Sequence, residues 1–211
     1  MSTERRRAAV VLARYSAAGA APPGTAAADL ERAALADTYE VLADLVGVTS
    51  GIAGPDEVAG LLWPGAVQLP DLPLAELVER LHDGLDELVV VPADVPDLPG
   101  LVLAKVFKVL HRTDVVVAPQ VGGRGCVAVG LRLPLAPWLA GWLRTEELDL
   151  DQDPYERLVA AAPSRGRCAR APGWHRLRNL TDLRRLDPGL EGWEESRLLL
   201  SAYPEVLGKR R

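Results

Sequence analysis

The feature that most constrains the fold of this chain is a set of short, continuous apolar runs. The clearest are Ala8–Ala13, Leu88–Val91 and the Val/Ala-rich segment Asp114–Ala118. They show no regular alternation with polar residues, which is typical of strands covered on both faces of a sheet. Helical apolar spacing is found between them, most clearly in Ala28–Val46 and Leu74–Leu85. This alternation indicates βαβ units, so we expect an α/β fold with a mostly parallel sheet.

The rest of the chain completes one domain. Its 211 residues are enough for one substantial core, and neither an internal repeat nor a low-complexity linker is visible. We therefore expect a single domain over residues 1–211, with a core at about 8–186 and a C-terminal helical extension at about 187–207. The further expected strands are 48–53, 66–69 and 126–129, and the further expected helices are 100–112, 137–144, 154–162, 181–186 and 192–203.

Composition limits the partners. The formal net charge of −5 provides no long-range attraction for nucleic acid or anionic lipid, which argues against both as main partners. The charge is unevenly distributed, because the stretch 165–185 is rich in arginine and contains Asp182 as its one acid. A local anion site there remains open.

The expected location is the cytoplasm. The chain has two cysteines, too few for a disulfide framework. The apolar run 8–13 is too short for a signal-peptide core, and no stretch reaches the length of a membrane span.

Ligands of open parallel sheets bind beyond the carboxyl ends of the strands. That rule selects three loops, namely Arg14–Thr25, Pro92–Pro99 and Gln120–Gly125. The site of this protein should lie where these loops meet.

The second loop carries the most informative acid. Asp94 lies three residues past a buried strand, and three prolines stiffen its loop. Mg²⁺ needs only one or two protein carboxylates in addition to substrate phosphates, so Asp94 is the first candidate for a metal ligand and catalytic residue. Asp97 is the second candidate ligand. The alternative is that both are turn formers and that Asp97 caps the following helix.

The other two loops offer groups for an anionic ligand. The turn containing Gly122 and Gly123 would let backbone N–H groups approach a ligand closely, although it also suits a tight strand connection. Arg124 in that turn and Arg14 after the first strand are candidate phosphate contacts, and a solvated arginine is the alternative for Arg124.

Several segments in order, above all Val89–Pro99 (VVVPADVPDLP) and Val115–Leu131 (VVVAPQVGGRGCVAVGL), resemble the bacterial GT-A-type glycosyltransferase-like family. They are also similar to the 2-phospho-lactate guanylyltransferase family. The resemblance implies a nucleotide-diphospho-sugar-transferase (GT-A) fold, a three-layer α/β/α sandwich with a mostly parallel mixed sheet. It also implies Mg²⁺ or Mn²⁺ near Asp94 and a nucleoside phosphate or nucleotide sugar between the first loop and that aspartate.

The chain departs from the family pattern at functional positions. Residues 16–30, where the family has a Lys/Arg-containing phosphate loop, hold no basic residue. Arg178 stands where the family has a second metal carboxylate. Two hypotheses follow from this sign reversal: Arg178, with Arg176, holds a phosphate directly, or the domain has kept the fold and lost catalysis.

Three functions therefore remain open. The first is a nucleotide-dependent transferase acting by glycosyl or nucleotidyl transfer. The second is an inactive GT-A-like module that binds a partner or forms a homo-oligomer, motivated by four tryptophans, Trp138, Trp142, Trp174 and Trp193, in the last third of the chain. The third is a guanylyltransferase of the 2-phospho-lactate type.

Overall fold

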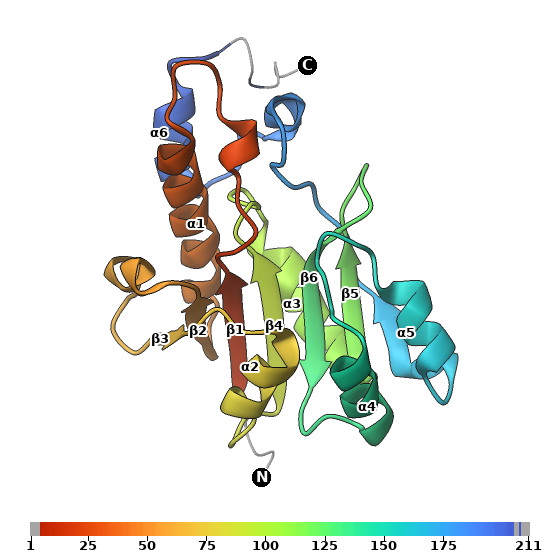
Figure 1. Cartoon of the computed structure of the whole chain (residues 1–211). Coiled ribbons are helices and arrows are strands. Elements are labelled where there is room, and N and C mark those ends of the chain that lie inside the picture. The colour runs from red at the N-terminus through yellow and green to blue at the C-terminus, as the bar shows by residue number, and fades with distance from the viewer. Residues whose placement is uncertain (1–4, 205–206, 208–211) are drawn as a thin grey trace.

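The computed structural model describes residues 5–204 and 207, which form a seven-stranded mixed sheet covered by helices on both faces (Figure 1). The strand order is β3-β2-β1-β4-β6-β5-β7. Among the paired strands, β6 is antiparallel to both of its neighbours and the other pairings are parallel. The strands are β1 (Arg7–Leu12), β2 (Val48–Ala53), β3 (Val67–Leu69), β4 (Glu87–Pro92), β5 (Val115–Pro119), β6 (Cys126–Arg132) and β7 (Cys168–Arg170).

The helices form the two outer layers of the expected α/β/α sandwich. Helices α1 (Ala27–Ala43) and α3 (Gly100–Leu110) bury apolar side chains against one face of the sheet. Helices α2 (Leu74–Leu81), α4 (Pro137–Thr145) and α5 (Tyr155–Ala161) do so on the other face. The α/β class and mixed sheet inferred from the sequence are confirmed.

The register of the central strands positions the site. Leu12 of β1 pairs with Ala53 of β2 and with Pro92 of β4, so these three parallel strands end at the same level. Strand β5 points the same way as β4, because both are antiparallel to β6. The loops that follow β1, β2, β4 and β5 therefore meet at one edge, which we call the carboxyl edge.

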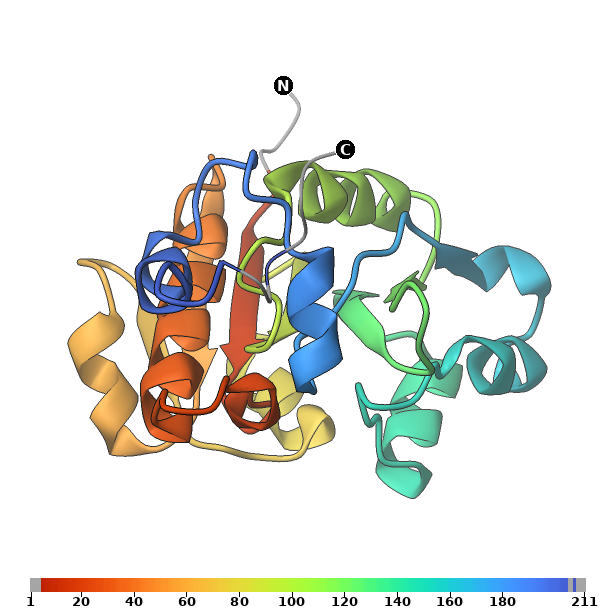
Figure 2. The ribbon, with the colours of Figure 1, turned by 90° about the horizontal axis from the view of Figure 1, so that it is seen from above.

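The C-terminal part of the chain folds over that edge. Leu177, Leu183 and Trp193 share an apolar cluster with Ala17 of the first loop and Leu30 of α1. Seen from above, the segments around the short helices η1 (Ala18–Ala20) and η4 (Leu180–Arg185) lie over the sheet, and α6 (Glu194–Leu200) lies beside α1 (Figure 2).

Most expected elements are present, with shifted ends. The first helix was predicted to reach Val46 but ends at Ala43, four residues before Gly47 with its φ of +73°. The segment predicted as a helix at 181–186 is the 3₁₀ helix η4, which begins with a capping box of Asn179 and Asp182. Four elements were not predicted from the sequence: β7, η1 and two further 3₁₀ helices, η2 (Asp56–Leu61) and η3 (Arg165–Arg167).

Candidate functional site

The carboxyl edge brings the three predicted loops together with a fourth segment, residues 174–178. Gln120 and Trp174 form an isolated parallel bridge, and the backbone N–H of Leu177 donates to the carbonyl oxygen of Asp94 over 2.8 Å. The fourth segment thus crosses the ends of β4 and β5 and delivers its alternate side chains, including Arg176, toward the sheet.

Asp94 lies at the centre of this edge and is tied to Arg176. Arg176 Nε donates to Asp94 Oδ1 over 2.8 Å, and Arg176 Nη2 donates to Asp94 Oδ2 over 2.9 Å. Both side chains are buried, at 0 and 1% exposure. Burial raises the pKa of the Asp94 carboxyl, and the adjacent Arg176 guanidinium opposes that rise. The fork-on-fork contact is the strong, geometrically specific form of an arginine–carboxylate pair.

A second ion pair, between Arg178 and Asp151, adjoins the first. Arg178 Nε is 4.0 Å from Asp94 Oδ2, and Asp151 contacts both guanidinium groups, with Oδ1 at 3.0 Å from Arg176 Nη2. Tyr15 supports this arrangement from the first loop, because the Arg176 guanidinium lies 5.2 Å from its ring centre. Its hydroxyl accepts from the backbone N–H of Leu150 and donates to Asp149.

Asp97 is directed away from this cluster. Its Oδ1 accepts from Trp174 Nε1 over 3.1 Å and is 3.0 Å from His175 Nε2, while Oδ2 accepts from the backbone N–H of Asp187. The predicted cap of the following helix is not formed, because α3 begins after Pro99 without a side-chain cap. Asp97 therefore anchors the C-terminal segment and does not join Asp94 in one ligand set.

The glycine turn after β5 is filled by the protein's own side chains. A Cβ on Gly123 would lie 2.4 Å from the Gln120 side chain, and a Cβ on Gly122 would lie 3.0 Å from the Arg185 guanidinium. We expected a ligand to approach the backbone of this turn closely. In the structure, the side chains of Gln120 and Arg185 make that approach. Arg124 is exposed at the tip of this turn.

Arg14 lines a cavity of about 610 Å³ at the carboxyl edge. The cavity is bounded by the residues that follow β1, β2 and β4 and by the first turn of α1, with Ala13, Pro55, Ala93 and Ala28 among them. Its charged residues are Arg14, Arg32, Asp29, Glu31, Glu57 and Asp71. Arg14 Nη1 donates to Asp71 and to the carbonyl oxygen of Leu72, so that guanidinium is already held by the protein.

The residues at Asp94 do not fit the predicted Mg²⁺ or Mn²⁺. A hard cation needs free carboxylate oxygens, and both oxygens of Asp94 accept hydrogen bonds from a buried guanidinium. Within residues 5–204 and 207, no group of three or more His, Cys, Asp or Glu side chains has the spacing of a metal site. Arg176 and Arg178 therefore supply, at this carboxylate, the positive charge assigned to a metal from the sequence.

Two parts of this cluster were not predicted from the sequence. Asp151 and Tyr15 are separated by 136 positions in the chain and meet only through the fold. A signal did exist for the first, because Asp149, Asp151 and Asp153 alternate shortly before an arginine-rich stretch whose charges need partners. Asp153 indeed contacts Arg170, with 2.8 Å between Oδ2 and Nη1.

The four tryptophans taken as interface candidates lie largely inside the protein. Trp193 and Trp142 are buried, at 1 and 8% exposure, and Trp138 and Trp174 are partly buried in the two cores. Trp63, which was not singled out, is 47% exposed. The four residues therefore contribute to core packing.

Comparison with known proteins identifies the fold. No known family model and no curated protein sequence matches the chain. Among solved structures, a candidate nucleotide-diphospho-sugar transferase of Desulfovibrio desulfuricans G20 matches with a TM-score of 0.68 and 19% identity over 96% of both chains. The chain has the nucleotide-diphospho-sugar-transferase fold.

Other solved structures with this transferase fold differ more. The 4-diphosphocytidyl-2C-methyl-D-erythritol synthase of Anaerococcus prevotii DSM 20548 gives a TM-score of 0.57 and 10% identity, covering 81% of this chain and 88% of that one. The Rv0371c protein of Mycobacterium tuberculosis H37Rv, described as a complex with manganese, gives 0.52 and 18%, covering 94 and 100%. These identities establish the shared fold alone. None of the helices in the described residues is long and apolar enough to cross a membrane.

Proposed function

We propose that this protein binds a nucleoside phosphate in the cavity lined by Arg14, and that this binding needs no divalent metal at Asp94. The observation that carries the proposal is the position of the cavity. It lies beyond the carboxyl ends of β1, β2 and β4, where open α/β sheets bind their ligands. Solved structures with the same fold are described as nucleotide-diphospho-sugar transferases and cytidylyltransferases.

The size and chemistry of the cavity support a nucleoside. Its volume of about 610 Å³ lies within the range of about 300–1,000 Å³ of small-molecule sites. Ala13, Leu35 and Val58 offer an apolar wall for a base, and the carboxylates of Asp29, Glu31 and Glu57 can accept hydrogen bonds from ribose hydroxyls or amino groups. The cavity has more acidic than basic side chains and therefore repels a phosphate. We expect the phosphate to lie outside the cavity, near the arginines beside Asp94.

Asp94 in this proposal is a positioning residue. It holds the Arg176 guanidinium at the end of β4, and Ala93, which precedes Asp94 in the chain, lines the cavity. Stabilisation of phosphate charge then comes from fixed guanidinium groups, which need no reorganisation when the ligand arrives. We further propose that the bound nucleotide takes part in glycosyl or nucleotidyl transfer. Arg178, which is partly exposed, would be the accessible phosphate contact.

The test is a calorimetric titration of the protein with nucleosides and nucleoside mono-, di- and triphosphates. It is performed in EDTA and repeated with Mg²⁺ and with Mn²⁺. We expect micromolar to millimolar affinity for at least one base, equal within about twofold in EDTA and in metal. Binding that appears only with a metal, or no binding of any member of the series, would overturn the proposal.

A matched pair of variants locates the site. Ala28 is exposed and lines the cavity, whereas the neighbouring Ala27 is exposed and does not line it. Ala28→Trp should abolish nucleoside binding by filling the cavity, and Ala27→Trp should retain it. Equal effects of the two substitutions would place the ligand elsewhere.

The inactive GT-A-like module is the second candidate function. It is favoured by the hydrogen bonds between Arg176 and both oxygens of Asp94, because a saturated carboxylate cannot act as a metal ligand or base without breaking a buried pair. Turnover distinguishes the candidates. Pyrophosphate release from GTP with a phosphorylated hydroxy acid would support the guanylyltransferase, and binding of nucleotide with no turnover across acceptors would support the inactive module.

A further inference from the structure

Two guanidinium groups and two carboxylates form a closed charge cluster at the carboxyl edge. Arg176 and Arg178 carry the positive charges, and Asp94 and Asp151 carry the negative ones. The four formal charges of this cluster therefore sum to zero. Removing either carboxylate would leave one guanidinium charge without compensation, and such a charge attracts an anion.

The two carboxylates differ in how firmly they are held. Asp94 is 1% exposed and is fixed by the bidentate contact with Arg176. Asp151 is 50% exposed and belongs to a turn after α4, where its backbone N–H donates to Asp149 Oδ1 over 2.8 Å. Only Asp151 can leave the cluster by a local rearrangement of a surface turn.

Asp151 makes the contacts that a phosphoryl oxygen would make. Its Oδ1 contacts Arg176 Nη2 and Arg178 Nη2 at once, so one anionic oxygen bridges two guanidinium groups. Guanidinium donors match carboxylate and phosphate oxygens with similar geometry. We propose that Arg176 and Arg178 form an anion site for a phosphoryl group, and that Asp151 fills this site as an internal substitute until a ligand phosphate displaces it.

Tyr15 connects the anion site to the cavity assigned to a nucleoside. Its ring lies close to a guanidinium group of each, with Arg14 at 5.6 Å and Arg176 at 5.2 Å from the ring centre. Arg14 lines the cavity, and Arg176 belongs to the anion site. The identity of the ligand rests on the proposed function. The base of the nucleotide would enter the cavity, and its phosphate would replace the Asp151 carboxylate.

The experiment measures binding of inorganic phosphate and of pyrophosphate by calorimetry, in EDTA and at constant ionic strength. We expect the unmodified protein to bind both weakly, since Asp151 competes for the site. Asp151→Asn should bind them at least about tenfold more tightly, because the amide leaves the arginine charge uncompensated. Adding Arg178→Gln to Asp151→Asn should cancel the gain.

Asp153→Asn is the matched control. It removes the same charge from the same segment, but Asp153 contacts Arg170 instead of Arg178. We expect it to leave phosphate affinity within about twofold of the unmodified protein. Equal gains in Asp151→Asn and Asp153→Asn would reduce the effect to overall charge and overturn the proposal.

A second substitution, Asp151→Ser, keeps the test decisive if the asparagine variant unfolds. Unchanged phosphate affinity in a folded Asp151 variant would also overturn the inference. Failure here is distinguishable from failure of the proposed function. Nucleoside binding without a phosphate gain would remove only the anion site, and a phosphate gain without nucleoside binding would remove only the cavity's assignment.

Discussion

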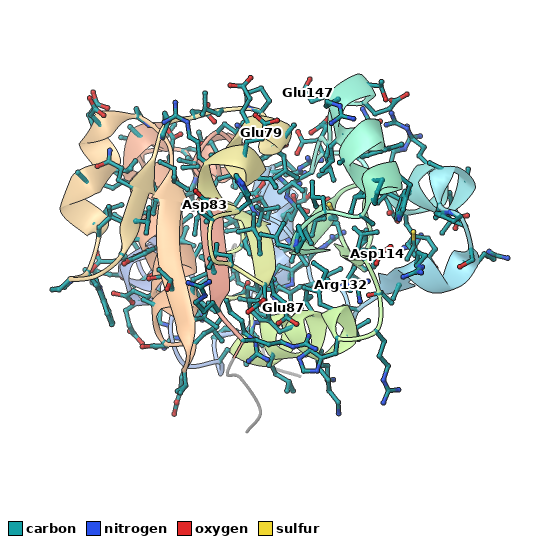
Figure 3. The ribbon with its side chains drawn as sticks, turned by 90° about the horizontal axis from the view of Figure 1, so that it is seen from below. Glu79, Asp83, Glu87, Asp114, Arg132 and Glu147 are labelled. Atoms are coloured by element: carbon teal, nitrogen blue, oxygen red, sulfur yellow. The ribbon has the colours of Figure 1, made fainter. Side chains whose placement is uncertain are left out.

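The two ends of strand β4 each carry a buried carboxylate, and they neutralise it in different ways. Glu87 begins the strand and is fully buried, with the partly exposed Arg5 and Arg7 at 2.7 and 2.9 Å. Asp94 lies two residues past the end of the strand, and its main partner, Arg176, is itself fully buried. Figure 3 shows the amino end from below, where Arg132, the cross-strand neighbour of Glu87, pairs with Asp114.

The difference separates a structural edge from a candidate site. At the amino end, partly exposed arginines cover the carboxylate, and water screens the contact. At the carboxyl edge, the cation is brought in by a dedicated segment, 174–178, and is held by Asp94, by the carbonyl oxygen of Leu150 and by the ring of Tyr15. Such rigid preorganisation is what a binding site requires.

The largest expected effect comes from breaking the buried pair. Arg176→Met leaves the buried Asp94 carboxylate without its bidentate partner and with Arg178 only at 4.0 Å, which should lower the free energy of unfolding by about 3–5 kcal/mol. Urea denaturation measures the change. The double substitution Asp94→Leu/Arg176→Met should recover most of the loss, because two apolar side chains need no compensation. A loss below about 1 kcal/mol in the single variant would contradict the buried pair.

Asp37 adds a third kind of buried carboxylate, which has no salt bridge to any of the described residues. Both of its oxygens accept backbone N–H groups at the start of α6, from Glu195 and Ser196. Burial raises the pKa of Asp37 to about 6 from its ordinary 3.8, so the folded protein holds this proton more tightly than the unfolded chain does. The stability contributed by protonation is complete below about pH 4 and disappears as pH rises through about 6.

The corresponding measurement compares the protein with Asp37→Asn. Between pH 4 and pH 7 the unmodified protein should lose up to about 3 kcal/mol relative to the variant, which cannot titrate. Urea midpoints at several pH values give the difference. Parallel pH profiles for the two proteins would show that Asp37 titrates normally.

A smaller effect is expected at the amino end. Glu87→Gln should cost about 1–2 kcal/mol, because its partners remain solvated when the charge is lost. The cost should shrink as salt approaches about 1 M, whereas the cost of Arg176→Met should stay constant. The same salt dependence at both positions would remove the contrast between the two ends of β4.

The smallest effect concerns the glycine turn. Gly123→Ala places a Cβ against the movable end of Gln120, so we expect a loss below about 1 kcal/mol. Gln120→Ala in the same chain should recover that loss, and nucleotide affinity should not change. A drop in nucleotide affinity without a drop in stability would instead support a ligand role for this turn.

The sequence was sufficient for the fold, and it indicated the edge of the sheet where a candidate site would lie. Apolar runs identified β1, β4 and β5, and the rule for parallel sheets placed the site at their carboxyl ends. The family resemblance also indicated that an arginine stands in place of a metal-binding carboxylate near Asp94. Arg178 Nε indeed lies 4.0 Å from Asp94 Oδ2.

Sequence alone could not predict which side chains would neutralise one another. Arg176 lies 82 positions after Asp94, and Asp151 lies 57 positions after it, so local spacing carries no information about their contact. The same limit explains Asp97, which pairs with Trp174 and His175 across a chain crossing that no local pattern indicates. Long-range charge pairing is decided by the tertiary path of the chain.

A titration with Mn²⁺, followed by the electron paramagnetic resonance signal of the free ion, tests most directly whether arginine has replaced a metal at Asp94. Because Arg176 occupies both oxygens of Asp94, no bound Mn²⁺ should depend on that carboxylate. The unmodified protein and Asp94→Asn should therefore give the same curve. One equivalent of bound Mn²⁺ that is lost in Asp94→Asn and kept in Glu87→Gln would contradict it.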